Sequence, residues 1–208
     1  MNSDQIIVTS QQTKLILSKR TKSPVIVITN GYDFEINKSC KLDTKFTFSH
    51  VGNLQDGRNP EFLWKTLHDL VQNSIDFSKH FRLNLIGYIS EAVLNSIRIY
   101  GLEAYTNYSG YVSHSEALEY QSRTQLLLLI EENSKETKYI IPGKLFEYIA
   151  SRRPIIAIGP DGSDIENIVT KSASGNYFRY EESELLSSVI LGYFERYKRN
   201  DLYVEPKE

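Results

Sequence analysis

The chain has 208 residues, of which 40% are hydrophobic and 24% charged, an ordinary composition for a globular protein with enough material for a core. Its formal net charge of −2 gives no basic excess, so nucleic acid is not expected as a partner. The single cysteine, Cys40, excludes an internal disulfide and a cysteine zinc site, and favours a reducing compartment. The longest apolar run, residues 126–130, is too short to cross a bilayer, and the N-terminus does not resemble a signal peptide. We therefore expect a cytoplasmic protein.

Short apolar runs alternate with helical periods along the chain, which predicts parallel strands joined by helices. In chain order, strands are expected at residues 6–8, 25–29, 46–51, 83–86, 104–107, 126–130 and 154–158, of which the fifth is the weakest. Helices are expected at about residues 12–19, 60–72, 90–100, 115–123 and 181–198, with two more beginning near 142 and 163. Asn59 is placed to cap the second helix at Pro60, and Ser163 with Glu166 fits a capping box. The predicted fold class is α/β, a doubly wound, Rossmann-like parallel sheet.

Two parts of unequal size are expected. Residues 1–21 supply one strand and one helix, which would need a partner sheet, and are interpreted as a remnant of a preceding domain and hinge. Residues 22–208 form the second part, because no linker interrupts their series of strands and helices.

The loop at residues 52–58 follows a predicted strand, at the edge where open parallel sheets bind ligands. Its glycines let the backbone approach a ligand, and the amides of a following helix favour an anion. Arg58 would add a forked, permanently charged contact to a phosphate. The pattern is neither a Walker loop nor a G-x-G-x-x-G fingerprint, so a flexible loop with a solvated arginine stays open as an alternative.

The helix expected from Pro142 carries two charged residues of interest. Lys144 lies in its first turn, where a cation opposes the helix dipole at a cost of up to roughly 1 kcal/mol unless an anion lies between them. Glu147 follows three residues later on a largely apolar helix, and its carboxylate needs a hydrogen-bonding partner such as a sugar diol. Judged locally, a Lys144–Glu147 surface ion pair is the favoured interpretation.

Other segments point to ordinary structure. The loops at residues 108–114 and 159–163 follow predicted strands, but as isolated sequence each is better explained as a turn. Glu131 and Glu132 form a local acidic pair that is expected to be solvated. The four histidines lack metal-ligand spacing, and no G-x-S-x-G nucleophile elbow is present.

Five segments together resemble, in the same order, motifs in the C-terminal half of GT-B-fold retaining glycosyltransferases of the group 1, or family 4, type. These segments are residues 4–10, 28–33 (ITNGYD), 50–58 (HVGNLQDGR), 110–120 and 142–157. The last of them, PGKLFEYIASRRPIIA, is the most specific. Five motifs in order reverse the local interpretation of Lys144 and Glu147.

The resemblance implies a domain that binds a UDP- or GDP-linked nucleotide-sugar and transfers its sugar to an acceptor hydroxyl, in surface polysaccharide or glycolipid synthesis. Glu147 would accept hydrogen bonds from ribose hydroxyls, Arg58 and Lys144 would face the diphosphate, and Tyr111 and Val112 would border the base. The implied donor-binding residues are Gly52, Asn53, Arg58, Tyr111, Val112, Gly143, Lys144 and Glu147. No cofactor and no metal are implied.

The sequence departs from the family pattern in three ways. Tyr139 stands eight positions before Glu147, where family members often carry a second glutamate, so the residue beside the transferred sugar is left open. Asn59 follows Arg58 where lysine-glycine is common. The N-terminal acceptor domain would precede Asp4, so the chain is expected to be a fragment with little activity of its own.

The resemblance is compatible with peripheral membrane association of the full-length protein. Two alternatives to a glycosyltransferase stay open. One is a nucleotide-sugar epimerase of the same fold. The other is a non-catalytic α/β binding module, which Tyr139 favours.

Overall fold

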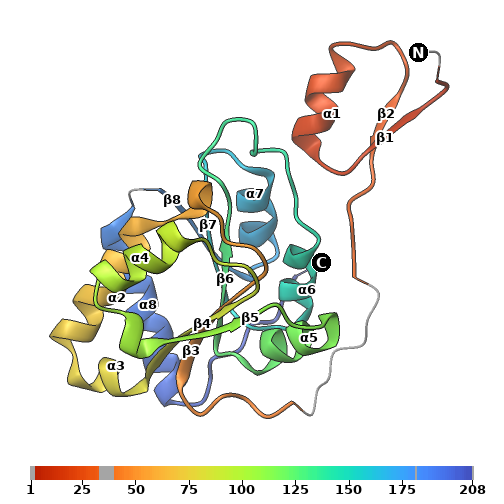
Figure 1. Cartoon of the computed structure of the whole chain (residues 1–208). Helices are drawn as coiled ribbons and strands as arrows, with labels where there is room; N and C mark the ends of the chain where they lie inside the picture. Colours follow the sequence, from red (N-terminus) through yellow and green to blue (C-terminus); the bar gives the residue numbers. More distant parts are fainter. Residues whose placement is uncertain (1–2, 33–39, 181, 208) are drawn as a thin grey trace.

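The structure is a computed structural model that describes residues 3–32, 40–180 and 182–207. These residues form a parallel sheet of six strands with helices on both faces, and a separate parallel sheet of two strands (Figure 1). The α/β, doubly wound, Rossmann-like class predicted from the sequence is confirmed. No helix of the described part is long and apolar enough to cross a membrane.

The six-stranded sheet has the order β5-β4-β3-β6-β7-β8, and every pair in it is parallel. Its strands are β3 (Phe46–Val51), β4 (Phe81–Ile86), β5 (Thr106–Gly110), β6 (Leu126–Ile130), β7 (Ile155–Gly159) and β8 (Gly175–Arg179). The strand order reverses between β3 and β6. In open parallel sheets the crevice outside the carboxyl ends of the strands at such a reversal is the usual ligand site.

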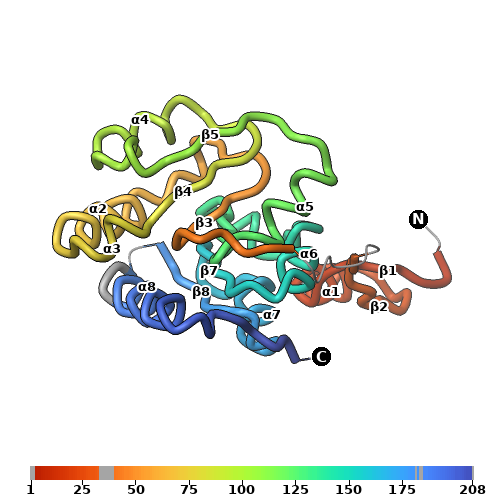
Figure 2. Tube along the Cα trace, turned by 90° about the horizontal axis from the view of Figure 1, so that it is seen from below, coloured from red at the N-terminus to blue at the C-terminus, as the bar shows by residue number. Residues whose placement is uncertain are grey.

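Two sets of helices cover the two faces of this sheet (Figure 2). The first face carries α2 (Glu61–Asn73), α3 (Ile75–His80), α4 (Glu91–Ile99) and α8 (Ser183–Lys198). The second face carries α5 (His114–Arg123), α6 (Lys144–Ala150) and α7 (Asp164–Lys171). The described part also contains two short 3-10 turns, η1 (Asp56–Arg58) and η2 (Glu103–Tyr105).

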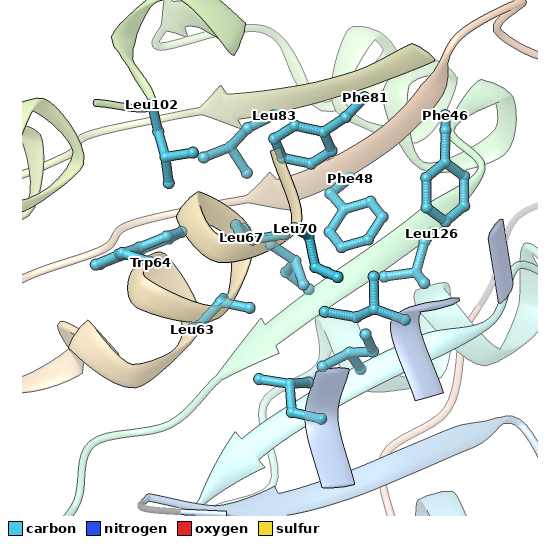
Figure 3. Close-up of a cluster of buried hydrophobic side chains, with 14 of the residues drawn as sticks. Phe46, Phe48, Leu63, Trp64, Leu67, Leu70, Phe81, Leu83, Leu102 and Leu126 are labelled. Carbon is cyan, nitrogen blue, oxygen red and sulfur yellow. The ribbon is translucent and has the colours of Figure 1, made fainter. Parts of the chain in front are cut away.

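The central strand β6 explains why the sequence shows an unbroken apolar run there. Leu126, Leu128 and Ile130 face the first set of helices, whereas Leu127 and Leu129 face the second, and all five are buried. A strand buried on both faces needs apolar residues at every position rather than at alternate ones. Figure 3 shows the first of these two cores, in which side chains of β3 and β4 pack against one face of α2, including Phe48, Leu83, Trp64 and Leu67.

The N-terminal unit consists of β1 (Ile6–Val8), α1 (Gln11–Ser18) and β2 (Val25–Val27). Strand β2, which the sequence places in the second part of the chain, pairs with β1 and not with the described strands of the six-stranded sheet. The division between residues 21 and 22 itself stays a prediction. Of the hinge-like motif at 28–33, Asp33 lies outside the described residues.

The capping role predicted for Asn59 is wrong. Helix α2 begins at Glu61, and its N-cap, Pro60, has no side-chain cap. The Asn59 side chain instead accepts a hydrogen bond from Trp64 Nε1 at 2.7 Å and donates one to Ser96 Oγ at 2.8 Å. Asn59 therefore ties α2 to α4 by satisfying a buried indole N–H.

The structure also differs from the prediction at the N-terminus of α7 and at the starts of β5 and α8. Ser163 caps α7 by accepting from Ile165 N at 3.1 Å, but Glu166 accepts from Gly162 N, so the predicted capping box is incomplete. Strand β5 begins at residue 106, after a 3-10 turn in place of the predicted strand start. The last helix begins at residue 183, and residue 181, where it was predicted to begin, lies outside the described residues.

Candidate functional site

The loop after β3 continues the pairing of the sheet beyond the strand end. Gly52 N donates to Ile86 O at 2.8 Å, and Gly52 and Gly87 both have a left-handed φ, of +120° and +114°. A Cβ on Gly87 would lie 2.8 Å from the Gly52 carbonyl carbon, so a side chain there would collide with backbone. Glycine at these positions brings two backbones together and exposes the loop at the crevice.

Lys144 reaches this loop from the first residue of α6. Its Nζ donates to Val51 O at 3.2 Å, and a Cβ on Gly52 would lie only 3.3 Å from it. Among the described residues, no carboxylate lies within 4 Å of Nζ. Burial and the nearby Arg58 lower the pKa of Lys144 to about 7, although Glu147 opposes the shift.

Tyr148 fixes α6 against β3. Its buried hydroxyl accepts a hydrogen bond from Val51 N at 3.0 Å and faces Val51 O at 3.4 Å. The position of Lys144 therefore follows from a well-packed helix residue rather than from a loop. Helix α6 has only seven residues, so its dipole adds little to the site.

Arg58 ends the 3-10 turn η1 and is half-buried. It lines one cavity together with Lys144 and Glu131. In the described part of the chain, its guanidinium forms no ion pair within 4 Å. Arg58 and Lys144 are thus two neighbouring cations that form no ion pair within 4 Å with the described residues, an arrangement that an anion would stabilise.

Glu147 points away from Lys144, toward α5. It accepts a hydrogen bond from Gln121 Nε2 at 2.8 Å, and its other oxygen lies 3.3 Å from His114 Nε2. The Lys144–Glu147 surface ion pair, which local sequence reasoning favoured, is absent among the ion pairs of the described residues. The side chain of Glu147 is 22% exposed, so its carboxylate is both positioned and accessible.

The structure describes the exposure of the other four residues implied by the resemblance. Asn53 and Gly143 are exposed, and Tyr111 is 93% exposed. Val112 is half-buried and packs against the core on the α5–α6 side of the sheet. The role of all four in binding stays a prediction.

Glu131, at the carboxyl end of β6, was not predicted as a site residue, and its predicted solvation is wrong. It is 7% exposed, and its carboxylate accepts from Tyr177 Oη at 2.9 Å and from Ser163 Oγ at 3.2 Å. Burial raises the pKa of Glu131 to about 7, although both hydrogen bonds and Arg58 lower it. Glu132, its neighbour, is exposed as expected.

A larger cavity, of about 740 Å³, lies at the other edge of the sheet. It is lined by residues that precede β3, β6 and β7, among them Asp43, Gln125 and Arg153. This edge faces the amino ends of the strands, and none of the residues described above lines it. The carboxyl edge, where Arg58 and Lys144 form no ion pair among the described residues, is the candidate site.

No protein-family model matches this chain, and no curated protein matches it by sequence. Solved structures do match. HepE from Anabaena, solved with UDP, aligns with a TM-score of 0.71 and 16% identity over 96% of this chain and 56% of its own. Sucrose-phosphate synthase from Thermosynechococcus elongatus aligns with a TM-score of 0.70 and 16% identity over 97% of this chain and 51% of its own. WaaG, a glycosyltransferase involved in lipopolysaccharide biosynthesis, aligns with a TM-score of 0.67 and 12% identity over 96% of this chain and 60% of its own.

The chain is one half of a GT-B fold. At these identities the likeness establishes the fold, and it agrees with the resemblance drawn from the five sequence motifs. The chain spans 51% to 60% of the length of the three proteins named above. The GT-B half carries its cluster of Arg58, Lys144 and Glu147 beside the point where the strand order reverses.

Proposed function

We propose that this chain is the donor-binding domain of a glycosyltransferase, an enzyme that moves a sugar from a nucleotide-sugar to an acceptor hydroxyl. The observation that carries the proposal is the pair of neighbouring cations, Arg58 and Lys144, neither of which forms an ion pair within 4 Å among the described residues. A diphosphate supplies the missing negative charge. The UDP bound to the related HepE structure supports this choice of ligand.

Each residue of the cluster has a distinct part in the proposed reaction. The bond between the anomeric carbon of the sugar and the diphosphate oxygen breaks, and the acceptor oxygen forms the new bond and gives its proton to the departing diphosphate. Arg58 and Lys144 stabilise the negative charge that the departing diphosphate gains. Glu147, held by Gln121, accepts hydrogen bonds from the ribose hydroxyls. No cofactor is part of the proposal.

A second domain is proposed as the partner that supplies the acceptor site. Ile7 and Ile26 pair across β1 and β2 and are 61% and 42% exposed. Parallel strands are found almost only in sheets with both faces covered, so this pair needs further strands and a covering layer. An N-terminal acceptor domain, as the resemblance implies, would provide them.

The acceptor and the process belong to the same proposal. Synthesis of a surface polysaccharide or glycolipid in the cytoplasm, with peripheral membrane association of the full-length protein, is suggested by the resemblance. The fold shared with WaaG is compatible with it.

Calorimetric titration of the chain with UDP, GDP and their sugars tests the proposal. We expect saturable binding that Glu147→Ala abolishes and that Arg58→Gln and Lys144→Met each weaken about tenfold or more. Lys65→Met is the matched control, because Lys65 is an exposed cation on α2 whose loss makes the same change of charge away from the site.

Two outcomes count against the proposal. If no nucleotide binds, the non-catalytic module becomes the better interpretation. If Lys65→Met weakens binding as much as Lys144→Met, the affinity comes from net charge rather than from this site. Product analysis with the full-length enzyme separates a transferase, which consumes an acceptor, from an epimerase, which returns an altered nucleotide-sugar.

A further inference from the structure

We propose that Glu131 is the sugar-side contact of the donor site, where its carboxyl group hydrogen-bonds one or two hydroxyls of the transferred sugar. This inference rests on the proposed function and deepens it. It assigns the role that Tyr139 leaves open, and it places the contact on a different segment from the usual glutamate, at the end of β6.

The order of charged groups along the carboxyl edge supports the assignment. Glu147 lies at one end, with its partners on α5. Lys144 comes next, close enough to both Glu147 and Arg58 to be affected by their charges. Glu131 lies at the other end, between β6, β7 and α7, where it shares a cavity with Arg58.

A nucleotide-sugar is a linear molecule with the diphosphate between its nucleoside and its sugar. If the ribose lies at Glu147 and the diphosphate at Lys144 and Arg58, the sugar extends away from α5 and toward β6. Among the described residues that line the cavity beyond the two cations, the ionisable ones are Glu131 and Glu132. Of these two carboxylates, only that of Glu131 is held in place by surrounding hydrogen-bond donors.

The surroundings of Glu131 fix its side chain. One oxygen accepts from Tyr177 Oη and the other from Ser163 Oγ, while the backbone oxygen accepts from Tyr180 Oη at 2.7 Å. A Cβ on Gly159 would collide with the Glu131 carboxylate and the Tyr177 hydroxyl, so glycine is needed there to admit them. A carboxylate can accept about four hydrogen bonds, and two of these are used, which leaves capacity for sugar hydroxyls.

The cavity beside Glu131 has a volume of about 40 Å³. Its lining includes apolar and hydroxyl groups as well as the charged ones, from Ile130, Thr137, Ile140 and Pro142. A volume of this size accepts one or two hydroxyl groups rather than a whole sugar ring. The inference is therefore a contact at one edge of the sugar, with the rest of the ring in the open half of the cleft.

The chemistry of Glu131 suits a neutral, hydroxyl-rich ligand beside a diphosphate. Burial raises the pKa of Glu131 to about 7, so near neutral pH the group is available in both its protonated and its ionised form. A nearby diphosphate would raise the pKa further, which favours the protonated form. A protonated carboxyl both donates to and accepts from hydroxyls, and it does not repel the phosphates.

The test compares the affinity for a nucleotide with the affinity for the corresponding nucleotide-sugar. Wild type, Glu131→Gln and Tyr177→Phe are titrated with UDP, UDP-glucose, UDP-N-acetylglucosamine, GDP and GDP-mannose. Glu136→Gln is the matched control, because Glu136 is exposed on the same loop and does not line the cavity. Thermal melts of each variant show whether the fold is kept.

We expect wild type to bind one of the nucleotide-sugars more tightly than its nucleotide. Glu131→Gln should lower the affinity for that nucleotide-sugar about tenfold and leave the affinity for the nucleotide within about twofold of wild type. Tyr177→Phe should lower the affinity for the same nucleotide-sugar less, because it removes one hydrogen bond to the Glu131 carboxylate but keeps the carboxylate itself. Glu136→Gln should change neither affinity.

Three results would overturn the inference, and they are distinguishable from failure of the proposed function. Equal losses for nucleotide and nucleotide-sugar in Glu131→Gln would assign Glu131 to structure alone. An unchanged nucleotide-sugar affinity in that variant would remove it from the site. If the wild-type chain binds UDP or GDP but binds no nucleotide-sugar more tightly than its nucleotide, the donor site stands and the sugar contact at Glu131 is refuted. Failure of wild type to bind any of the five compounds would instead refute the donor site itself.

Discussion

The lowered pKa of Lys144 leads to a prediction about how nucleotide binding depends on pH. In the free protein, burial and Arg58 lower the pKa of this ammonium group to about 7. A bound diphosphate would raise it again, because an opposite charge favours the protonated form. Binding above pH 7 must therefore be accompanied by proton uptake at Lys144, and affinity must fall as the pH rises.

The size of the effect follows from the shift. Affinity is fully present below pH 7 and decreases about tenfold per pH unit above it, until the pKa of the bound state is reached. Between pH 7 and pH 9 the dissociation constant of UDP should rise about fifty-fold, if the bound pKa is near the ordinary value for lysine. The nucleotide itself contributes little over this range, because a terminal phosphate with a second pKa near 6 is already ionised at pH 7.

Other groups at the site also titrate or carry charge. Glu131, with a pKa of about 7, gains negative charge over part of the same range and would weaken diphosphate binding in the same direction. Lys144→Arg separates these contributions, because a guanidinium keeps its charge at every pH used while the rest of the site is unchanged.

Calorimetric titrations with UDP at pH 7, 8 and 9, in buffers of different ionisation enthalpy, measure affinity and proton uptake together. Wild type should take up close to one proton per nucleotide at pH 8, and Lys144→Arg should take up markedly less, with a flatter profile. If the affinity for UDP changes equally with pH in wild type and in Lys144→Arg, and proton uptake is also equal, then Lys144 is not the group that takes up the proton on binding. That result would refute the reasoning.

Two predictions concern stability. The pKa of Glu131 is raised from 4.5 to about 7, so the stabilisation by its extra proton is complete below pH 4.5 and is lost as the pH rises through 7. The loss is roughly 2–3 kcal/mol, or about 4–12 °C in melting temperature. Thermal melts at pH 5 and pH 7.5 measure it, and Glu131→Gln should abolish this difference between the two melting temperatures. Tyr148→Phe leaves the buried Val51 N–H without its partner and should destabilise the fold by about 1–3 kcal/mol in urea denaturation, whereas a loss below about 0.5 kcal/mol would show that water replaces the hydroxyl.

Most of the main sheet could be predicted from the sequence because its strands are buried on both faces. Leu126–Ile130 and Phe46–Val51 have the predicted bounds, and the unbroken apolar run of Leu126–Ile130 has few structures available to it other than a buried strand. Edge strands lack this signal. Gly175–Arg179 carries asparagine, tyrosine and arginine and was not predicted, because only one side of an edge strand is hydrogen-bonded and its faces are partly exposed.

Pairing partners could not be predicted where the local sequence was uninformative about them. Val25–Val27 has the β-branched composition of a core strand, and the uninterrupted series of strands and helices from residue 22 onward predicts it within the main domain. Its partner in the described structure is β1, and Ile26 on its outer face is exposed. Composition identifies a strand that must be covered, but it does not identify which residues cover it.

The site shows the same limit of local reasoning at the level of single side chains. Lys144 and Glu147 lie three residues apart on one helix, and helix geometry alone makes them an ion pair. In the structure, Val51 O attracts the lysine toward β3, and Gln121 on α5 holds the glutamate. Those partners lie 93 and 26 residues away along the chain, so no spacing rule within the helix could reveal that the charges separate. Their separation leaves Lys144 without an ion pair among the described residues, and it is therefore the tertiary structure that turns an ordinary helix motif into a candidate anion site.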